Sequence, residues 1–363
     1  MNPFFRKIKV FIQKYERHIS SAALIGGFIL DSLTLRRIDL LVENLILFAY
    51  ILIAGAGIIF TNLYAGGVWK GKLIERIHPF FPIIIQFAFG GLFSGFLVFY
   101  SRSASLIASW PFMIVLVGLL IGNELFKKYY IKLTFQISVY FFVLFSYFIF
   151  YIPVLINRMG DTIFLLSGAV SLVIIGIYFY ILSRIVPIPF KESKKYIMLS
   201  VGSIFIIVNL FYFTNILPPI PLSLKDAGAY HKVTRTADGY EVHKEVEGVK
   251  SFFKRRQTIH VTSGEPVYVY SSVFAPTALN TNIVHHWQYY NEQTRSWTTT
   301  SRVSFSIVGG RDGGYRGYSI KTNTFTGLWR VNVETARGQI IGRETFKIER
   351  VDIHVPLEIE IRK

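Results

Sequence analysis

Of the 363 residues, 52% are hydrophobic and only 17% are charged, whereas about a quarter of the residues in soluble globular proteins carry a charge. Lysine and arginine outnumber aspartate and glutamate by 39 to 22, but most of the excess lies in short segments beside apolar runs, which indicates membrane topology and argues against a nucleic-acid partner. The absence of cysteine excludes disulfides, thiolate metal sites, iron–sulfur clusters and a thiol nucleophile.

The chain up to Pro218 contains apolar runs of membrane-spanning length. A helix needs roughly 20 apolar residues to cross a bilayer core about 30 Å thick, because each residue rises about 1.5 Å. One run, Ser20–Leu35, is shorter than this and contains Asp31. The runs that meet the length are Asp39–Tyr64, Phe80–Tyr100, Ser105–Phe126, Ile131–Ile156, Thr162–Ser183 and Tyr196–Leu217.

The positive charges of the connecting segments decide whether Ser20–Leu35 is a span. With seven spans, and with residues 1–19 as a basic cytoplasmic N-terminus, 15 lysines and arginines lie in cytoplasmic segments and four lie outside. Without that span the same residues divide about evenly, so the positive-inside rule favours seven spans. We therefore predict a seven-helix transmembrane bundle over residues 20–218, followed by a C-terminal domain outside the cytoplasm. The cytoplasmic residues are Arg6, Lys7, Lys9, Lys14, Arg17, Lys70, Lys72, Arg76, Lys127, Lys128, Lys132, Arg184, Lys191, Lys194 and Lys195, and the outer ones are Arg36, Arg37, Arg102 and Arg158.

A cleaved signal peptide is the alternative interpretation of residues 1–35, which combine a basic start with a short apolar core. Such a peptide ends in a pattern of small residues at its cleavage site. No such pattern follows here, because the chain continues through Asp31–Arg37 with charged and branched residues. The sequence therefore favours a retained membrane span.

The helical half offers few candidates for a transport path. Its acidic residues fall within about two turns of a predicted span end, where local pairing or snorkelling satisfies them. Asp31 and Asp39 share one outer turn with two arginines, which favours mutual neutralisation over an ion path. Deeper amides such as Gln86 and Gln136 are expected to hydrogen-bond between helices. An anchoring bundle is therefore favoured, with a transporter or channel as the alternative.

Two glycine pairs in this half have the small-xxx-small spacing, Gly91 with Gly95 and Gly118 with Gly122. This spacing lets helices approach closely, either within the fold or between subunits. The second case would make the protein a homo-oligomer.

A proline-rich segment ends the helical half. Proline cannot continue a helix and favours extended backbone, so Leu217–Leu222 ends the last span and begins a stiff neck. We predict a proline-started linker over residues 219–256, with one strand near Tyr240–Val246. A basic cluster closes this linker, and it either contacts lipid phosphates or forms a solvated turn. The cluster consists of Lys254, Arg255 and Arg256.

The pattern from Gln257 onward is that of β-strands. Short runs of aromatic and β-branched residues alternate with polar residues and are bounded by Gly, Pro and Asn. About seven strands at this spacing favour a soluble all-β domain over residues 257–363, sandwich-like as in immunoglobulin-type domains, with a small barrel as the alternative. The predicted strands lie near Thr258–Thr262, Glu265–Phe274, Ile283–Tyr290, Trp297–Val308, Tyr315–Ile320, Gly327–Thr335, Ile340–Ile348 and Val355–Ile361.

Several segments of this domain occur in a characteristic order. They are Pro266–Pro276, Ile283–Trp287, Gly310–Ser319 and Gly327–Val333, followed by Gly338, Gln339 and Phe346. Together they resemble the bacterial family called domain of unknown function 2914, over about residues 257–350. The helical half is also similar to the multi-span regions to which that domain is attached. The resemblance implies an extracytoplasmic module of a protein in the bacterial plasma membrane, and it implies no activity, cofactor or catalytic residue.

A glycine-rich hairpin at Gly309–Tyr318 is the first candidate binding site. Arginine offers a planar fork that suits carboxylate or phosphate, and tyrosine offers a flat stacking surface. Sugars and anionic polymers of the cell envelope need such a combination. The alternative is a structural hairpin in which Arg311 and Asp312 form local contacts. The candidate ligand-binding residues of the hairpin are Arg311, Tyr315, Arg316 and Tyr318.

Alternation along the predicted strands adds two candidates. His285 and Trp287 share one face and are expected in the core, where His285 makes a structural hydrogen bond. His286 then faces outward and is a candidate ligand-binding residue. In the same way Trp329 is expected in the core and Arg330 on a basic, aromatic outer face. The adjacent histidines point to opposite faces and cannot chelate one metal, so we predict no metal site, and no catalytic constellation is present.

The leading interpretation is a non-enzymatic envelope protein. Its membrane-anchored β domain would bind a partner protein, a glycan or an anionic polymer outside the cytoplasm, as a scaffold or sensor. The main alternative is a transporter or channel with an accessory β domain. A membrane-embedded enzyme is the third hypothesis, and it requires polar side chains from several helices to converge.

Overall fold

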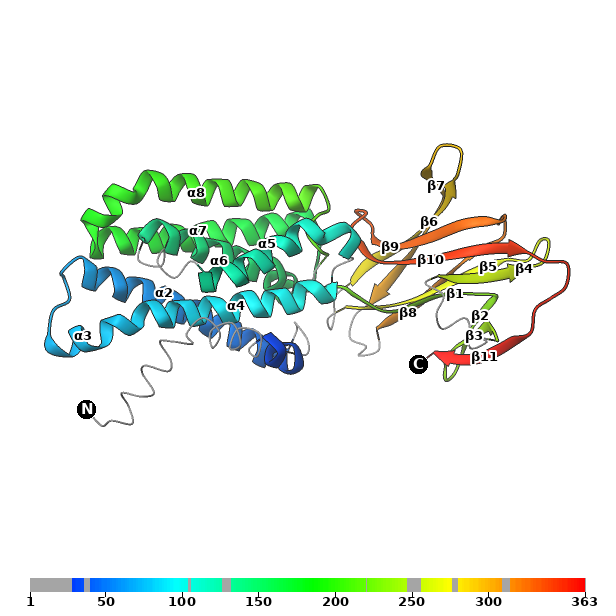
Figure 1. Cartoon of the computed structure of the whole chain (residues 1–363), viewed down its shortest axis with the longest axis horizontal. Helices are drawn as coiled ribbons and strands as arrows, with labels where there is room; N and C mark the ends of the chain where they lie inside the picture. Colours follow the sequence, from blue (N-terminus) through cyan, green and yellow to red (C-terminus); the bar gives the residue numbers. More distant parts are fainter. Residues whose placement is uncertain are drawn as a thin grey trace. The chain divides into compact units, whose positions relative to one another are not determined.

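The computed structural model describes residues 28–35, 40–103, 106–125, 132–219, 221–246, 256–275, 280–308 and 314–362. The chain divides into two compact units. One is helical and ends at Thr214, and the other comprises Asn215–Lys363 with the short segments Arg102–Ser109 and Val154–Gly160. Figure 1 shows the helices in blue to green and the strands in green to red.

Long apolar helices dominate the first unit. Among the described residues, five helices are long and apolar enough to cross a membrane, namely α2, α4, α6, α7 and α8, and α5 contains the shorter apolar stretch Ser109–Asn123. Residues 28–34 are helical as well, and the rest of the predicted span Ser20–Leu35 lies outside the described residues, apart from Leu35. The helices are α2 (Leu41–Ala65), α3 (Lys72–Ile77), the 3-10 helix η1 (His78–Phe80), α4 (Phe81–Ser103), α5 (Leu106–Leu125), α6 (Leu133–Ile156), α7 (Asp161–Ile185) and α8 (Pro187–Phe213).

Helix α8 differs most from its prediction, because it begins at Pro187 rather than at Tyr196. Proline suits the first position of a helix, where its fixed φ fits and its missing N–H is not needed. The following lysines, Lys191, Lys194 and Lys195, are exposed on the first turns. An apolar run marks the part of a helix that lipid can cover, and the helix itself extends beyond it.

Close helix contacts in this unit are made by small and amide side chains. A Cβ atom on Gly91 would lie 2.7 Å from the ring of Tyr50, and one on Gly95 would lie 2.8 Å from Leu47, so this glycine pair lets α4 approach α2 within the fold. Asn62 donates to Gln136 Oε1 at 2.7 Å and joins α2 to α6. The predicted interhelical amide bonds are therefore confirmed for Gln136.

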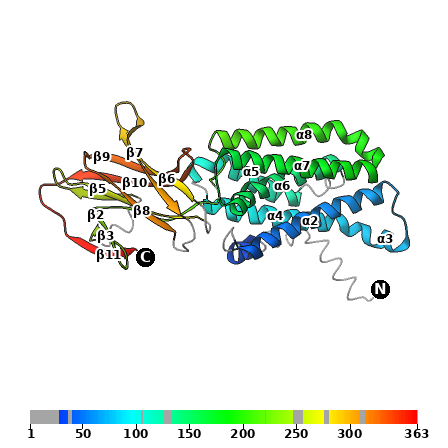
Figure 2. The same ribbon diagram turned by 180° about the vertical axis from the view of Figure 1, so that it is seen from behind.

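The second unit is β-rich. Its described strands form three sheets, with the orders β1-β5-β8, β4-β10-β9-β6-β7 and β11-β3-β2. All neighbouring strands are antiparallel except β4 and β10, which are parallel. Figure 2 shows the same strands from behind. The strands are β1 (Ser223–Tyr230), β2 (Lys232–Thr236), β3 (Gly239–Glu245), β4 (Gln257–Val261), β5 (Val267–Phe274), β6 (Asn280–Asn291), β7 (Ser296–Val308), β8 (Tyr315–Lys321), β9 (Gly327–Thr335), β10 (Ile340–Arg350) and β11 (Leu357–Arg362).

One hydrophobic core joins the sheet β1-β5-β8 to the five-stranded sheet. Trp287 and Trp329 are fully buried in it, as predicted, and they contact apolar side chains of β1, β4, β5 and β10. Burial of each such side chain contributes about 1.5–3 kcal/mol to stability. The β-rich domain is confirmed, and its classification as a sandwich stays a prediction, because the described strands form three sheets.

The boundary of the β domain differs from the prediction. Residues 219–256 were expected to be a linker with one strand, but β1, β2 and β3 lie within this range. Strand β1 pairs with β5 from Ser223↔Phe274 to Tyr230↔Tyr268, with a bulge at Leu224/Asp226. Polar residues and the bulge interrupt the alternation of β1, and for this reason the sequence pattern does not reveal the strand.

Candidate functional site

The five-stranded sheet has a polar face opposite its tryptophan core. Side chains alternate between the two faces of a strand, so Trp329 and Val331 point into the core while Arg330, Asn332 and Glu334 lie on the other face. Asn332 is only 3% exposed and Glu334 only 4%. Buried polar groups require hydrogen-bond partners, and the neighbouring strands supply them.

Strand register places the partners of this face in rows. Arg330 lies between Gln288 of β6 and Thr345 of β10. Asn332 lies between His286 of β6 and Arg343 of β10. Arg330 and Arg343 are thus diagonal neighbours on adjacent strands, where Cβ atoms lie roughly 7–8 Å apart and long side chains meet.

Two side-chain amides hold the two arginines. Arg330 Nε donates to Gln288 Oε1 at 2.7 Å, and Arg343 Nε donates to Asn332 Oδ1 at 2.6 Å. Asn332 Nδ2 in turn donates to Glu334 Oε1 at 3.0 Å. Each guanidinium group is therefore fixed by its Nε edge, and within the described residues its Nη groups have no hydrogen-bond partner.

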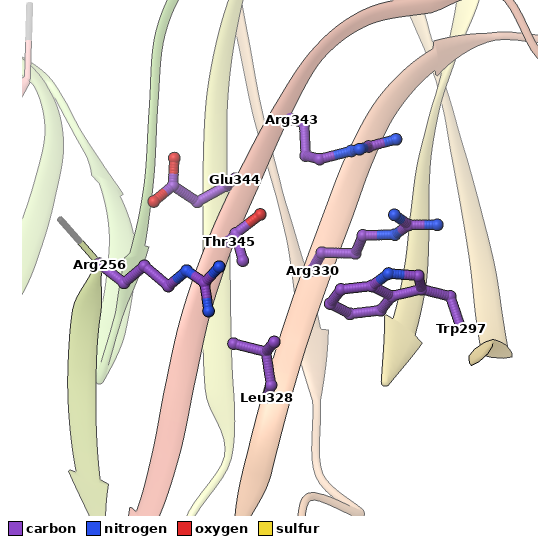
Figure 3. A pocket seen from close by; sticks show the side chains of 7 residues that line it. All are labelled: Arg256, Trp297, Leu328, Arg330, Arg343, Glu344 and Thr345. Atoms are coloured by element: carbon purple, nitrogen blue, oxygen red, sulfur yellow. The ribbon is translucent and has the colours of Figure 1, made fainter. Parts of the chain in front are cut away.

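These arginines line an open cleft of about 470 Å³. Figure 3 shows the guanidinium groups of Arg330 and Arg343 extending in the same direction from neighbouring strands. The guanidinium carbon of Arg330 lies 4.1 Å from the centroid of the Trp297 ring, a cation–π contact that further fixes its position. The cleft is lined by Arg256, Trp297, Leu328, Arg330, Arg343, Glu344 and Thr345.

The electrostatics of the cleft favour a negative ligand. Burial and the positive charge of Arg343 together lower the pKa of Arg330 to about 10, although the negative charge of Glu334 opposes them. Burial also lowers the pKa of Arg343. Glu344 also lines the cleft, and burial and the charge of Asp226 raise its pKa to about 7. Two cations are therefore held close together at a cost in free energy that an anion between them would offset.

His286 lies on the polar face, as predicted, and belongs to the network beneath the arginines. Its Nδ1 is 2.9 Å from Glu334 Oε1 and its Nε2 is 2.8 Å from Thr299 Oγ1. Arg302 donates to the other oxygen of Glu334 at 3.1 Å. Both ring nitrogens of His286 are thus engaged, and its role as a ligand-binding residue stays a prediction.

The neighbouring His285 has the structural role that its position predicts. It is fully buried, with Nε2 2.7 Å from Ser271 Oγ and Nδ1 2.8 Å from Ser319 Oγ. Burial lowers the pKa of His285 to about 3, so the ring is neutral at physiological pH. Ser319 Oγ also accepts the indole N–H of Trp287 at 2.9 Å. These hydrogen bonds join β6 of the five-stranded sheet to β5 and β8 of the sheet β1-β5-β8.

Of the predicted hairpin residues, Tyr315, Arg316 and Tyr318 do not line this cleft. Arg311 lies outside the described residues, and the other three are on β8, in the sheet β1-β5-β8. Tyr315 packs against one core cluster and Tyr318 against another, beside Tyr240 and Tyr268. The backbone oxygen of Arg316 accepts the hydroxyl of Tyr240 at 3.1 Å. Of the candidate residues that the structure describes, Arg330 and His286 share one face.

The second arginine of the cleft, Arg343, and both amides that orient the pair were not among the residues predicted from the sequence. Arg343, Thr345 and Lys347 alternate along β10 as Arg330 and Asn332 do along β9. That alternation predicts that β9 and β10 each place polar side chains on one face of the sheet. Which residues become neighbours depends on strand register, and a single sequence does not specify it.

Comparison with known proteins identifies a family region within the β domain. Residues 280–348 match the family described as "Protein of unknown function (DUF2914)". The chain carries a DUF2914 region. The resemblance of the β domain to this family is thereby confirmed over residues 280–348, and this region runs from β6 to β10 and includes Gln288, Arg330, Asn332 and Arg343.

Two further comparisons add no functional information about the DUF2914 region. No curated protein matches the chain. Among solved structures, the chain is similar to "Pseudomonas fluorescens alkylpurine DNA glycosylase AlkC bound to DNA containing an abasic site analog", with a TM-score of 0.23 and 7% identity over 86% of this chain and 100% of that chain. A TM-score this low carries no argument about fold or activity.

Proposed function

We propose that this chain is a multi-span protein of the bacterial plasma membrane whose sandwich-like β domain binds an anionic envelope ligand outside the cytoplasm. The ligand sits in the cleft between Arg330 and Arg343, and the helices anchor the domain. Five helices of membrane-crossing length and the charge bias of their connecting segments support the membrane part. The protein acts as a scaffold or sensor rather than as an enzyme.

The observation that carries this proposal is the oriented arginine pair. Gln288 and Asn332 occupy the Nε edges of Arg330 and Arg343 and leave the Nη groups for a ligand. Guanidinium forks recognise carboxylate and phosphate oxygens through paired, charge-assisted hydrogen bonds. Holding two partly buried arginines close together costs stability, because like charges repel. An anionic ligand between them would offset this cost.

The size and lining of the cleft favour an anionic glycan over a bare ion. A volume of about 470 Å³ is much larger than a single carboxylate or phosphate group needs. Trp297 and Leu328 give the cleft an apolar wall, and Thr345 adds a hydroxyl group. Sugar rings use this combination of an aromatic face and polar edges.

The membrane orientation can be tested by reporters fused to the C-terminus of the full chain. Seven spans and a cytoplasmic N-terminus place Lys363 outside the cytoplasm. Alkaline phosphatase fused after Lys363 is then expected to be active, and green fluorescent protein fused at the same position is expected to be non-fluorescent. The opposite pattern would place the β domain in the cytoplasm and remove an envelope ligand from consideration.

The ligand class can be tested with the full chain in phosphatidylcholine nanodiscs. We expect a fluorescent oligogalacturonate to bind and a neutral dextran of equal length not to bind, with the affinity falling as salt screens the arginines. A linear polyphosphate serves as the second anionic probe and separates carboxylate from phosphate ligands. Equal binding of dextran, or no binding of either anion, would contradict an anion site.

A further inference from the structure

A second charged cluster centres on His231, and none of its residues lines the anion cleft between Arg330 and Arg343. This residue follows β1 and precedes β2, and its side chain is 4% exposed. Its Nε2 lies 3.1 Å from Glu245 Oε1, and its Nδ1 lies 3.1 Å from Glu265 Oε1. Both ring nitrogens thus face carboxylates, one at the end of β3 and one in the turn between β4 and β5.

This geometry specifies the protonation state of the ring. A neutral imidazole has one N–H donor and one lone pair, so it can donate to only one carboxylate. The second carboxylate would then face the lone pair and be repelled. Only the imidazolium form donates to both Glu245 and Glu265, and the arrangement is therefore that of a charged His231.

The carboxylates are held by other bonds and cannot easily turn away. Glu245 Oε1 accepts the backbone N–H of His260, and its Oε2 lies 2.8 Å from His260 Nδ1. Glu265 Oε2 accepts the backbone N–H of Thr262 at 2.9 Å and its hydroxyl at 3.1 Å. Loss of the proton on His231 would therefore be relieved by movement of the elements rather than of one side chain.

Two further histidines lie beside these carboxylates, and one of them also faces a third carboxylate. His260 Nε2 lies 3.5 Å from Glu349 of β10, and His354 Nδ1 lies 3.8 Å from Glu265 Oε2. The side chain of His354 is 78% exposed and that of His260 is 32% exposed. His231, with a side chain that is 4% exposed, is therefore the most buried histidine of the cluster.

The pKa directions agree with this geometry. Burial alone would lower the pKa of His231, but hydrogen bonds and charge from Glu245 and Glu265 outweigh it and raise the pKa above the ordinary 6.5. Burial raises the pKa of Glu245 and Glu265, but their hydrogen bonds outweigh it and leave both below the ordinary 4.5.

We propose that His231, Glu245 and Glu265 form a proton-operated latch that ties the β2–β3 hairpin to the β4–β5 turn. A histidine with a raised pKa contributes stability that is fully present below its unfolded value and is lost as pH rises through the folded value. The carboxylates contribute stability that is present above about 4.5 and lost in stronger acid. The latch is thus closed in mild acid and opens in alkali, whatever ligand the arginine cleft binds.

The latch can be tested by hydrogen–deuterium exchange of the full chain in nanodiscs at pH 5.5 and 9, corrected for intrinsic exchange. We expect amides of residues 232–245 and 262–265 to exchange about tenfold faster at pH 9, while β6 and β9 show no such change. In His231→Gln, both pH values should give the same exchange in these segments. His243→Gln is the matched control, because the His243 side chain contacts Glu241 on its own strand at 3.0 Å and, within the described residues, makes no hydrogen bond or ion pair with a second element.

A second variant covers the case in which His231→Gln does not fold. Glu265→Gln keeps an acceptor but removes one of the two charges, so the pH midpoint of the exchange change should fall by about one unit. An unchanged midpoint in Glu265→Gln, a pH response that persists in His231→Gln, or no pH response in the wild-type chain would each overturn the latch. None of these outcomes depends on anion binding, which is measured separately with oligogalacturonate.

Discussion

The double variant Arg330→Gln with Arg343→Gln is expected to bind the oligogalacturonate probe at least about 100-fold more weakly than the wild-type chain. Hydrogen bonds to charged groups contribute about 1.5–3 kcal/mol each, and about 1.4 kcal/mol is a tenfold change in affinity. Each single variant should therefore lose roughly tenfold. Glutamine is polar and of intermediate length, so the outer face of the sheet should stay folded.

A matched control separates this site from the general positive charge of the domain. Lys347 lies on β10 with Arg343, its side chain is 51% exposed, and it pairs with Glu349 outside the cleft. Lys347→Gln removes one positive charge and should change the affinity less than about twofold. The affinities can be measured by fluorescence anisotropy at one fixed salt concentration. Equal losses in Lys347→Gln and Arg343→Gln would show attraction by net charge and not a site.

The double variant also has an expected effect on stability that differs in sign from its effect on binding. Burial and the charge of Arg343, opposed by that of Glu334, lower the pKa of Arg330 to about 10, so the unliganded pair costs free energy. Removing both charges should leave the thermal midpoint of the unliganded chain unchanged or slightly higher. Weaker binding at undiminished stability is the combination that distinguishes a ligand site from a structural ion pair.

How far the sequence predicts the helices depends on the property that defines each end. The predicted spans Asp39–Tyr64 and Ile131–Ile156 end within two residues of α2 and α6, because hydropathy and helix coincide there. Helix α8 begins at Pro187 because lysines are good helix formers, and a hydropathy rule stops at them. Glycine spacing indicated a close helix approach at Gly91 and Gly95, but not that the neighbouring helix is α2 of the same chain.

The candidate site was predictable only in part, for a reason that applies to β-sheets in general. Alternation along one strand places Arg330 and His286 on an outer face, and the structure agrees. The partners of Arg330 come from β6 and β10, which are brought next to β9 by register. Conversely, glycines and arginines near Tyr318 suggested a binding hairpin, but its tyrosines are partly buried and pack against core clusters. Residue type predicts what a side chain can bind, and register decides what it meets.

Trp329→Ala is expected to destabilise the β domain by about 3–5 kcal/mol, a large part of the stability of a domain of this size. The Trp329 side chain is fully buried, and its ring centroid lies 4.8 Å from that of Phe325 and 5.9 Å from that of Tyr289. Its indole N–H donates to the Phe325 carbonyl at 2.9 Å. The substitution removes the largest side chain of β9 from the core and leaves that carbonyl without its donor.

Trp297→Ala is the matched control in the same domain, because it deletes the same atoms from the other face of the five-stranded sheet. Trp297 is partly exposed, its ring contacts Arg330, and its ring centroid lies 5.3 Å from that of Tyr290. We therefore expect Trp297→Ala to lower the free energy of unfolding by about 1 kcal/mol and to weaken probe binding. Limited proteolysis of the full chain against urea concentration measures both variants. Equal destabilisation would mean that Trp329 is not in the core and that the face assignments of β9 are inverted. The assignment of the anion cleft to the outer face would then be wrong as well. Arg330 and Asn332 point outward only if Trp329 and Val331, with which they alternate, point inward.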